Sequence, residues 1–206
     1  MSEINYTCSL GSLCHSSVIL EQYKLCSYPF DWIFSNCDII IDCIEDDFNI
    51  FLDKSYYIDI SPLKCGHSKY IIDNNNCMFN HYNPLVNINH YNYYVRCVNR
   101  FKNLLQKQEH KLFLMLFINM NSIDENIKNM IIEFNNKFSK YTSNYTLLVI
   151  FQITNNEQNH IFTYNDNIHF LELYTLSVSN GTSFINDDKI YLDNIIKSKY
   201  NFNIKI

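Results

Sequence analysis

Glycine and proline are scarce in this sequence, with three of each among 206 residues. No Pro/Gly-rich linker and no internal repeat divides the chain, and its length fits one hydrophobic core. Hydrophobic residues make up 47% of the composition and charged residues 18%. That is enough apolar surface to offset the entropy lost on folding, so we expect residues 1–206 to form a single domain.

Long apolar runs are missing as well. A membrane-spanning helix needs about 20 apolar residues, and the most apolar stretch, residues 112–118, is far shorter. The chain begins with a segment that contains Glu3 and lacks the apolar stretch of a secretory signal. We therefore expect no membrane association and an intracellular, cytoplasmic location.

Positive charge is sparse. The formal net charge is -5 and the pI is near 5.7. Lysine and arginine form no cluster beyond the isolated Lys197 and Lys199. This balance is a poor electrostatic match to a polyphosphate backbone, so we expect no nucleic-acid partner.

Paired cysteine motifs are also absent. None of the eight cysteines forms a C-x-x-C pair, although all lie in the first half of the chain. Without a secretory signal they are expected to be reduced thiols, most of them small buried hydrophobic side chains.

What is present is a strand that leads into a helix near the start of the chain. Residues 6–10 predict a short strand that runs through Gly11 into a helix at about residues 12–25. Ser35 followed by Asp38 resembles a capping box. Apolar residues then recur three or four positions apart, which predicts an amphipathic helix.

The middle of the chain predicts an antiparallel hairpin. Residues 69–72 and 77–81 are rich in aromatic and β-branched side chains, and the turn-rich residues 73–76 separate them.

The second half alternates helix and strand patterns. Helices are expected around residues 94–105, 123–138 and 188–198, and strands at 111–118, 145–153, 160–164 and 168–174. The fold class is therefore α+β or α/β, with a mixed sheet flanked by helices.

Cys14 is the candidate nucleophile. It lies just after Gly11, at the predicted helix start, where unpaired backbone N–H groups can stabilise a thiolate. The amides of Ser12, Leu13 and Cys14 could also stabilise an oxyanion, because Gly11 lets the backbone approach closely.

A thiol nucleophile also needs a base, which is usually a histidine. His15 follows Cys14 directly and would point about 100° around the helix, so it is poorly placed. His81 ends a predicted strand and has the better geometry. The remaining histidines are His67, His90, His110, His160 and His169.

Two motifs resemble a known family. CSLGSLC at residues 8–14, followed by SYPFDWI at residues 27–33, resembles the family described as "putative papain-like cysteine peptidase", which is known from bacteria and large DNA viruses. Further segments match its pattern in order, namely Asp47 to Leu52, Phe79-x-His81 and Arg96 to Phe101.

The resemblance implies a papain-like fold in which Cys14 is the nucleophile and His81 the general base. It implies a thiol-dependent hydrolase, either a cysteine peptidase or a related enzyme that transfers the acyl group of an amide or thioester. The substrate would be a protein or peptide, no cofactor or metal is expected, and a viral member would act in the host cytoplasm.

The residue that orients the histidine departs from the family pattern. The family commonly follows its histidine with aspartate, whereas Tyr82 follows His81 here. That role is then lost or passes to Asn80 or Asn83.

The third catalytic residue therefore has several candidates. The family's C-terminal glycine-then-acid pattern matches Gly181 with Asp187, or alternatively Asp188. Asp31 is a further candidate, because the preceding proline turn could fold it towards the helix start.

Three other interpretations remain open. Cys14 could be one more buried apolar side chain. The scaffold could be catalytically inactive and act as a protein-binding module, which Tyr82 in place of an acid favours. A zinc site could form from Cys65, His67, Cys77 and His81.

Overall fold

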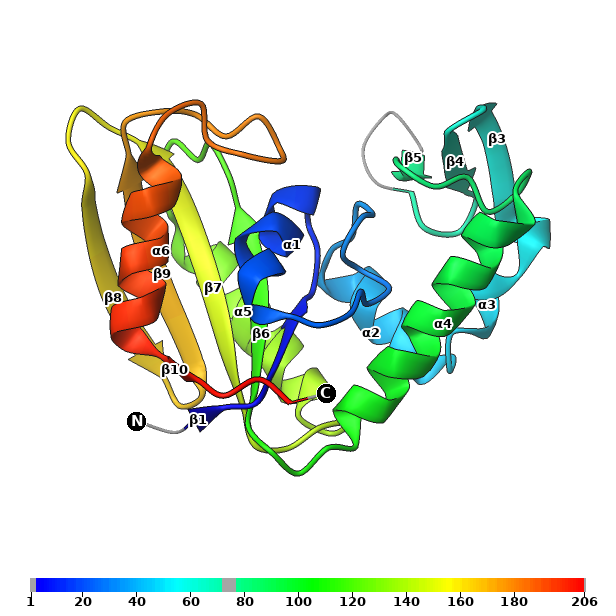
Figure 1. The fold of residues 1–206 in the computed structure, drawn as a ribbon, viewed down its shortest axis with the longest axis horizontal. Helices are drawn as coiled ribbons and strands as arrows, with labels where there is room; N and C mark the ends of the chain where they lie inside the picture. The colour runs from blue at the N-terminus through cyan, green and yellow to red at the C-terminus, as the bar shows by residue number, and fades with distance from the viewer. Residues whose placement is uncertain (1–2, 72–76, 206) are drawn as a thin grey trace.

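A five-stranded mixed sheet forms the main layer of the structure (Figure 1). The computed structural model describes residues 3–71 and 77–205. Four strands run parallel to their neighbours, and one edge strand is antiparallel. In spatial order the strands are β2 (Tyr6–Ser9), β6 (Lys111–Phe117), β7 (Tyr145–Thr154), β9 (Ile168–Thr175) and β8 (Asn159–Asn165).

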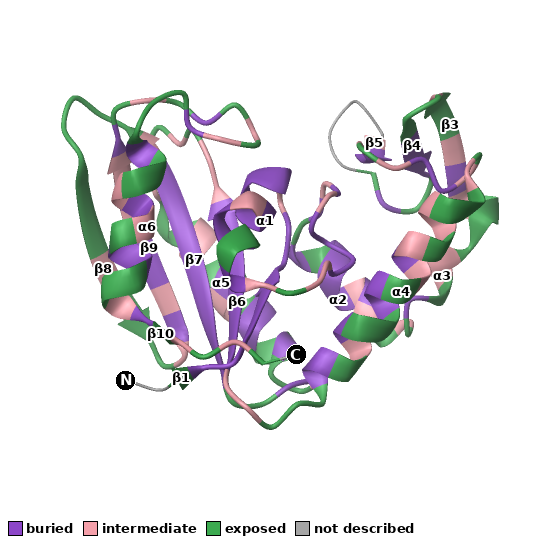
Figure 2. Cartoon of the chain, viewed as in Figure 1, coloured by how far each residue is buried: buried purple, intermediate pink, exposed green. Residues whose placement is uncertain are grey.

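The central strands are buried on both faces (Figure 2). Leu112, Leu114 and Leu116 of β6 pack into one hydrophobic cluster, whereas Phe113 and Met115 pack into another. Successive side chains of a strand point to opposite faces. Because both faces are covered, the strand appears in the sequence as a continuous apolar run, as predicted.

Helices cover both faces of this sheet (Figure 1), as the sequence predicted. One face carries α1 (Cys14–Leu20), the 3-10 helix η1 (Glu21–Tyr23) and α6 (Asp188–Lys199). The other face carries α2 (Cys37–Glu45) and α5 (Glu125–Phe138), and α4 (Ile88–Leu105) extends the core away from the sheet.

The capping box predicted for α2 was wrong. Asn36 is the N-cap, and its side-chain oxygen accepts a hydrogen bond from the Ile39 N–H at 2.9 Å. Ser35 is not available for capping, because its hydroxyl donates to the Leu10 carbonyl at 3.0 Å. Ser35 therefore ties the start of α2 to the end of β2.

A separate antiparallel sheet contains β3 (Tyr57–Ser61), β4 (Lys64–His67) and β5 (Cys77–Phe79). The predicted hairpin was right about β5 but wrong about its partner, which is β4. Residues 69–71 form no strand, because the N–H groups of Lys69 and Tyr70 bond to His67 Nδ1 and turn the chain away. The expected turn at residues 73–76 lies outside the described residues.

One hydrophobic core joins the two sheets. Phe79 of β5 packs edge-to-face against Tyr94 of α4, with ring centroids 4.8 Å apart. Phe101, further along α4, packs against Phe30 at 5.4 Å. The helix α3 (Asn49–Leu52) and the 3-10 helix η2 (Lys54–Tyr56) complete this side. The core therefore fixes where β5 ends relative to β2.

The two ends of the chain pair in a short parallel ribbon that no sequence pattern predicted. β1 (Glu3–Ile4) pairs with β10 (Asn201–Phe202). Tyr23 stacks on Phe202 with ring centroids 4.1 Å apart.

No helix within residues 3–71 and 77–205 is long and apolar enough to span a membrane. All eight cysteines are free thiols, and only Cys26 and Cys77 are partly exposed.

The segment between β9 and α6 is held by the buried carboxylate of Asp188. Its oxygens accept hydrogen bonds from the N–H groups of Leu176 and Ser177, at 3.0 and 2.8 Å, and from the Gln158 amide at 2.7 Å. Burial alone would raise the pKa of Asp188, but these donors hold the pKa below its ordinary value.

Replacing Asp188 with asparagine should destabilise the fold in a pH-dependent way. An amide nitrogen would face the Ser177 N–H, so we expect the free energy of unfolding to fall by about 2 kcal/mol at pH 7. Because the carboxylate pKa is depressed in the folded state, the contribution is present above the ordinary pKa of about 4 and is lost as pH falls below it.

Urea unfolding followed by circular dichroism at pH 7 and pH 3 would measure both effects. Asp187→Asn is the matched control, because Asp187 is exposed and makes no side-chain cap hydrogen bond. An Asp188→Asn variant as stable as this control at pH 7 would contradict the prediction.

Candidate active site

The turn between β2 and α1 has a backbone conformation that favours glycine. Gly11 has a φ of +82°, and a Cβ there would collide with the Ser35 hydroxyl. Ser12 also has a positive φ, 67°, and its N–H donates to Ser35 Oγ at 3.2 Å. The turn is thus tightly built, and it delivers the chain into α1 at Cys14.

Cys14 is the first residue of α1, and its sulfur contacts His81. Cys14 Sγ lies 3.2 Å from His81 Nε2, although the two residues are 67 positions apart in sequence. His81 lies two residues after β5, and its exposed ring packs edge-on against Trp32 with centroids 5.6 Å apart. The structure thus brings together the two residues that the sequence singled out.

The Cys14 thiol is held in its neutral form by its surroundings. The side chain is 3% exposed, and this burial raises its pKa to about 11. The Cys14 backbone N–H lowers the pKa and the charge of Asp31 raises it further, but both effects are smaller than burial. The thiolate stabilisation expected at the helix start is therefore outweighed by desolvation, and the thiol needs a proton acceptor.

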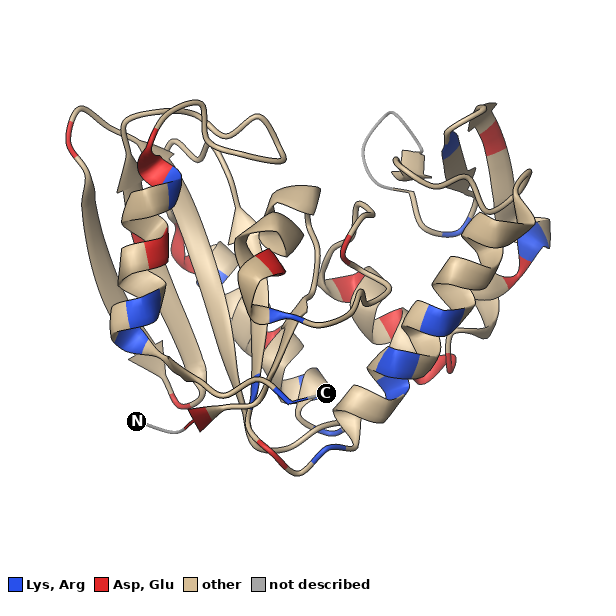
Figure 3. Cartoon of the chain, in the orientation of Figure 1, with Lys and Arg blue, Asp and Glu red and all other residues tan. Residues whose placement is uncertain are grey.

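The Cys14–His81 contact opens into a cleft of about 410 Å³. None of the described residues that line it carries a formal charge, and Figure 3 shows the bordering segment 177–186 in the colour of uncharged residues. The wall opposite His81 comes from the segment between β9 and α6 and from the end of β6. The lining residues are Leu13, Cys14, Phe34, Asn80, His81, Ile118, Asn119, Ser179, Asn180, Gly181 and Thr182.

His15 holds one wall of the cleft and does not contact the sulfur. Its backbone N–H donates to the Gly181 carbonyl at 2.9 Å, and its ring Nδ1 lies 2.7 Å from Ser179 Oγ. The ring packs against Phe184, and burial, with a smaller contribution from Lys189, lowers its pKa to about 4. His15 is a neutral structural side chain near neutral pH.

Of the three amides expected to form an oxyanion hole, Ser12 already has a partner in Ser35. The amides of Leu13 and Cys14 make no hydrogen bond to another residue in the described ranges. Both lie beside the sulfur, at the helix start.

None of the three candidate acids hydrogen-bonds to His81 in the part of the chain described. Asp187 is exposed outside the cleft lining, and Asp188 is engaged with Leu176, Ser177 and Gln158 as described above. Asp31 is fully buried and pairs with Lys24 Nζ at 2.7 Å. Asp31 and Asp188 are therefore engaged with other partners, and Asp187 lies outside the cleft lining.

The two asparagines near His81 occupy different positions. Asn80 lines the cleft. Asn83 is buried, and its amide donates to the carbonyls of Ser61 and Lys64 at 2.9 and 3.3 Å. Asn83 thereby fixes the turn after His81 to the β3–β4 hairpin.

The four candidate zinc ligands are used in other ways. His67 Nδ1 accepts two backbone N–H groups, while its Nε2 lies 3.1 Å from the Ile50 carbonyl oxygen. Cys65 Sγ contacts the Gly66 carbonyl at 3.2 Å. Within the described ranges, no group of three or more histidine, cysteine or acidic side chains could hold a metal ion.

The sequence did not single out Asn119 or Trp32 for a role beside the cleft. Asn119 has a positive φ of 54°, and it exchanges two 2.8 Å hydrogen bonds with Ser179 that hold the cleft wall. It comes shortly after the buried strand β6, at the carboxyl edge of a parallel sheet, where sites of α/β proteins occur. That position in the sequence, just after a buried strand, could have identified Asn119 as a residue near the site. For Trp32 the available signal was its place in the SYPFDWI motif at residues 27–33.

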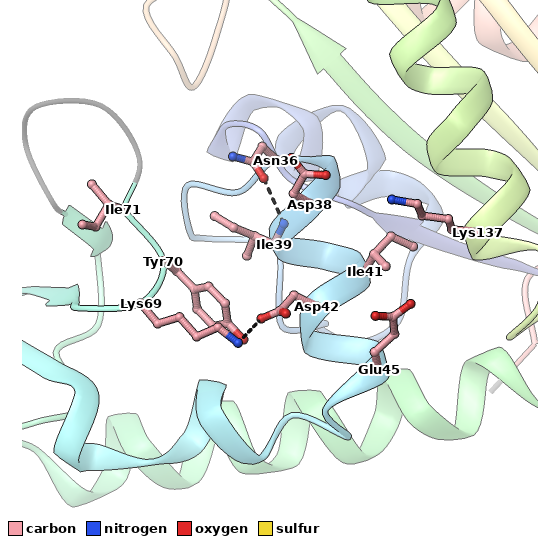
Figure 4. Close-up of a pocket in the computed structure, with 10 residues that line it drawn as sticks. All are labelled: Asn36, Asp38, Ile39, Ile41, Asp42, Glu45, Lys69, Tyr70, Ile71 and Lys137. Atoms are coloured by element: carbon pink, nitrogen blue, oxygen red, sulfur yellow. Dashed lines mark hydrogen bonds and ion pairs between the residues drawn. The ribbon is translucent and has the colours of Figure 1, made fainter.

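A second hollow lies on the far side of α2 (Figure 4). It measures about 440 Å³ and lies between α2, the segment at residues 69–71 and Lys137 of α5. Two of its charged residues form an ion pair, with Lys69 Nζ 2.6 Å from Asp42 Oδ2. Neither Cys14 nor His81 lines it.

Comparison with known proteins identifies a family. Residues 5–158 match the family model described as "Putative papain-like cysteine peptidase (DUF1796)". No curated protein and no solved structure matches the chain significantly. The matched region includes Cys14 and His81 but not Asp187 or Asp188. Because it spans most of the 206 residues, the chain belongs to this family of putative papain-like cysteine peptidases.

Proposed function

We propose that the protein is a thiol-dependent hydrolase of peptide or related amide bonds, with Cys14 as the nucleophile and His81 as the general base. The observation that carries this proposal is the 3.2 Å contact between Cys14 Sγ and His81 Nε2, two residues that line the cleft. A nucleophile and a base within hydrogen-bond reach are the defining pair of covalent acyl-transfer chemistry.

In the proposed reaction, Cys14 Sγ transfers its proton to His81 Nε2 and attacks the substrate carbonyl carbon. The amides of Leu13 and Cys14 donate to the oxyanion of the tetrahedral intermediate. The C–N bond then breaks as His81 returns the proton to the leaving nitrogen. A water molecule deprotonated by His81 hydrolyses the thioester and frees Cys14.

Burial of Cys14 fits a mechanism in which the thiolate forms as the reaction proceeds. A thiol with a pKa of about 11 is almost fully protonated near neutral pH. The intrinsic nucleophilicity of a thiolate rises with its pKa, so deprotonation by His81 would release a strong nucleophile.

The imidazole of His81 would be oriented by packing. Trp32 lies edge-on to the ring, and Asn83 anchors the turn that follows it. This arrangement would take the place of the acidic side chain expected after the histidine. In this proposal the papain-like part of the site is the Cys/His pair with its nucleophile at a helix start. An isopeptide or a thioester bond would suit the same pair.

A second function, an inactive scaffold that binds a protein in the cleft, is favoured by the raised pKa of Cys14. A sulfur that stays protonated would serve only as part of a binding surface. The two functions differ in whether His81 changes the reactivity of Cys14, which the next experiment measures.

Alkylation of Cys14 by iodoacetamide should depend on His81. Only the thiolate reacts, so His81→Ala should slow labelling at pH 7 by roughly 10²-fold. In that variant the rate should rise about tenfold per pH unit towards the thiol pKa of about 11.

Mass spectrometry of the Cys14 peptide separates its labelling from that of the other seven cysteines. His160→Ala is the matched control, because His160 is an exposed histidine that pairs with the Tyr191 hydroxyl and does not line the cleft. Equal Cys14 rates in wild type, His160→Ala and His81→Ala would favour the binding scaffold.

Cleavage of a peptide library should require both residues of the pair. Cys14→Ser should abolish the products, and His81→Ala should lower kcat/KM by about 10²- to 10⁴-fold. Cys26→Ser, which changes a partly exposed cysteine outside the cleft, should leave the products unchanged. Products that persist in Cys14→Ser would contradict the assignment of the nucleophile.

A further inference from the structure

The cleft wall opposite His81 is attached to the residue that follows the candidate nucleophile. We call residues 179–182 the wall segment, and all four of them line the cleft. The wall segment lies between β9 and α6, and Figure 1 shows this part of the chain in orange above α1. Because Cys14 lines the same cleft, the position of the wall segment relative to α1 sets the width of the cleft.

The wall segment caps the helix that carries Cys14. The first N–H groups of a helix have no partner within the helix, and the N-cap of α1, Leu13, makes no side-chain cap hydrogen bond. The His15 N–H instead donates to the Gly181 carbonyl at 2.9 Å. The start of α1 and the wall segment are therefore joined through the backbone at the residue next to the sulfur.

The His15 side chain makes a second link to the wall segment. Its Nδ1 lies 2.7 Å from Ser179 Oγ, and that oxygen also accepts the Gly181 N–H at 3.1 Å. The Ser179 backbone exchanges its two 2.8 Å hydrogen bonds with Asn119. His15 and Ser179 are 2% and 4% exposed. Loss of their bond would leave a buried polar group without its partner, which is costly.

The bonds inside the wall segment fix its shape, whereas bonds to other elements fix its position. Asn180 Oδ1 accepts the N–H groups of Thr182 and Ser183 at 3.0 and 2.8 Å. Such bonds join residues that are close in sequence, so they would survive a movement of the whole segment away from α1. The bonds with His15 and Asn119 would not survive that movement.

We propose that His15 is a positioning residue, which holds the wall segment at the distance from Cys14 that binds a substrate and takes no part in proton transfer. A peptide that fills the cleft would touch the wall segment and the sulfur together, whereas a reagent much smaller than the cleft needs only the sulfur. Loss of the bond between His15 and Ser179 should therefore weaken peptide binding without changing the reactivity of Cys14. The inference rests on the proposed function, because it takes Cys14 as the attacking atom.

Two substitutions separate the hydrogen bond of His15 from its packing. In His15→Phe a ring still packs against Phe184, but the bond to Ser179 is lost. In His15→Asn the ring is lost, but an amide atom takes the place of Nδ1 and can bond to Ser179 Oγ. Ser179→Ala removes the same bond from its other partner and leaves the histidine in place.

Alkylation of Cys14 by benzyloxycarbonyl-alanyl-alanyl chloromethyl ketone, an uncharged peptide reagent, would measure the effect. Its saturation kinetics give KI for binding and kinact for the chemical step. His15→Phe and Ser179→Ala should each raise KI about tenfold, as expected for one lost buried hydrogen bond, and should change kinact and the iodoacetamide rate by less than about twofold. Because the two substitutions break the same bond, the double variant should raise KI little further.

His15→Asn should keep KI within about threefold of the wild-type value, because the bond to Ser179 is retained. His169→Phe is the matched control and should leave KI unchanged. His169 Nδ1 also lies beside a hydroxyl, 2.8 Å from that of Tyr200, but His169 does not line the cleft. A KI in His15→Asn as high as that in His15→Phe would overturn the proposal, because packing would then account for the effect.

These measurements separate failure of the positioning role from failure of the proposed function. If iodoacetamide labels Cys14 in a His81-dependent way but KI is the same in wild type, His15→Phe and Ser179→Ala, the positioning role fails and the function stands. If labelling is independent of His81, the function fails, and amide hydrogen exchange decides the role of His15. The Gly181 N–H should exchange about tenfold faster in His15→Phe than in wild type or His169→Phe. Equal exchange rates would refute the role of His15 in holding the wall segment.

Discussion

The contact between Cys14 Sγ and His81 Nε2 is the interaction on which the functional account depends. Its two partners come from different sheets: Cys14 follows β2 of the mixed sheet, and His81 follows β5 of the antiparallel sheet. The aromatic packing of Phe79 against Tyr94, and of Phe101 against Phe30, ties those sheets into one core. A shift between the two sheets would separate the sulfur from the imidazole, so the geometry of the pair depends on the core.

The tight turn before Cys14 is held by one serine from the segment that leads into α2. Ser35 bonds to both sides of the turn, at Leu10 and Ser12, and so fixes the helix start that carries the sulfur. A single side chain just before α2 therefore positions the residue that we propose as the nucleophile.

Much of the fold could be predicted from the sequence, because continuous apolar runs and helical spacing are local signals. The strands of the main sheet and the helices that cover it follow from them. The bond from Ser35 to the end of β2 and the partner of β5 could not, because both depend on long-range contacts, of Ser35 with Leu10 and of β5 with β4. Cys14 was selected because it follows a glycine turn at a helix start and lies in the CSLGSLC motif. His81 was selected because it ends a predicted strand and lies in the Phe79-x-His81 match. The environments of Asp31 and Asp188 are set by Lys24 and by the segment after β9, which no spacing in the sequence reveals.

Cross-linking with 1,3-dibromoacetone would test the central claim most directly, because this reagent can bridge a sulfur and an imidazole nitrogen only when they lie close together. With the two atoms 3.2 Å apart, mass spectrometry should find the Cys14 peptide joined to the His81 peptide. A Cys14 peptide that carries the reagent without any bridge to His81 would contradict the account.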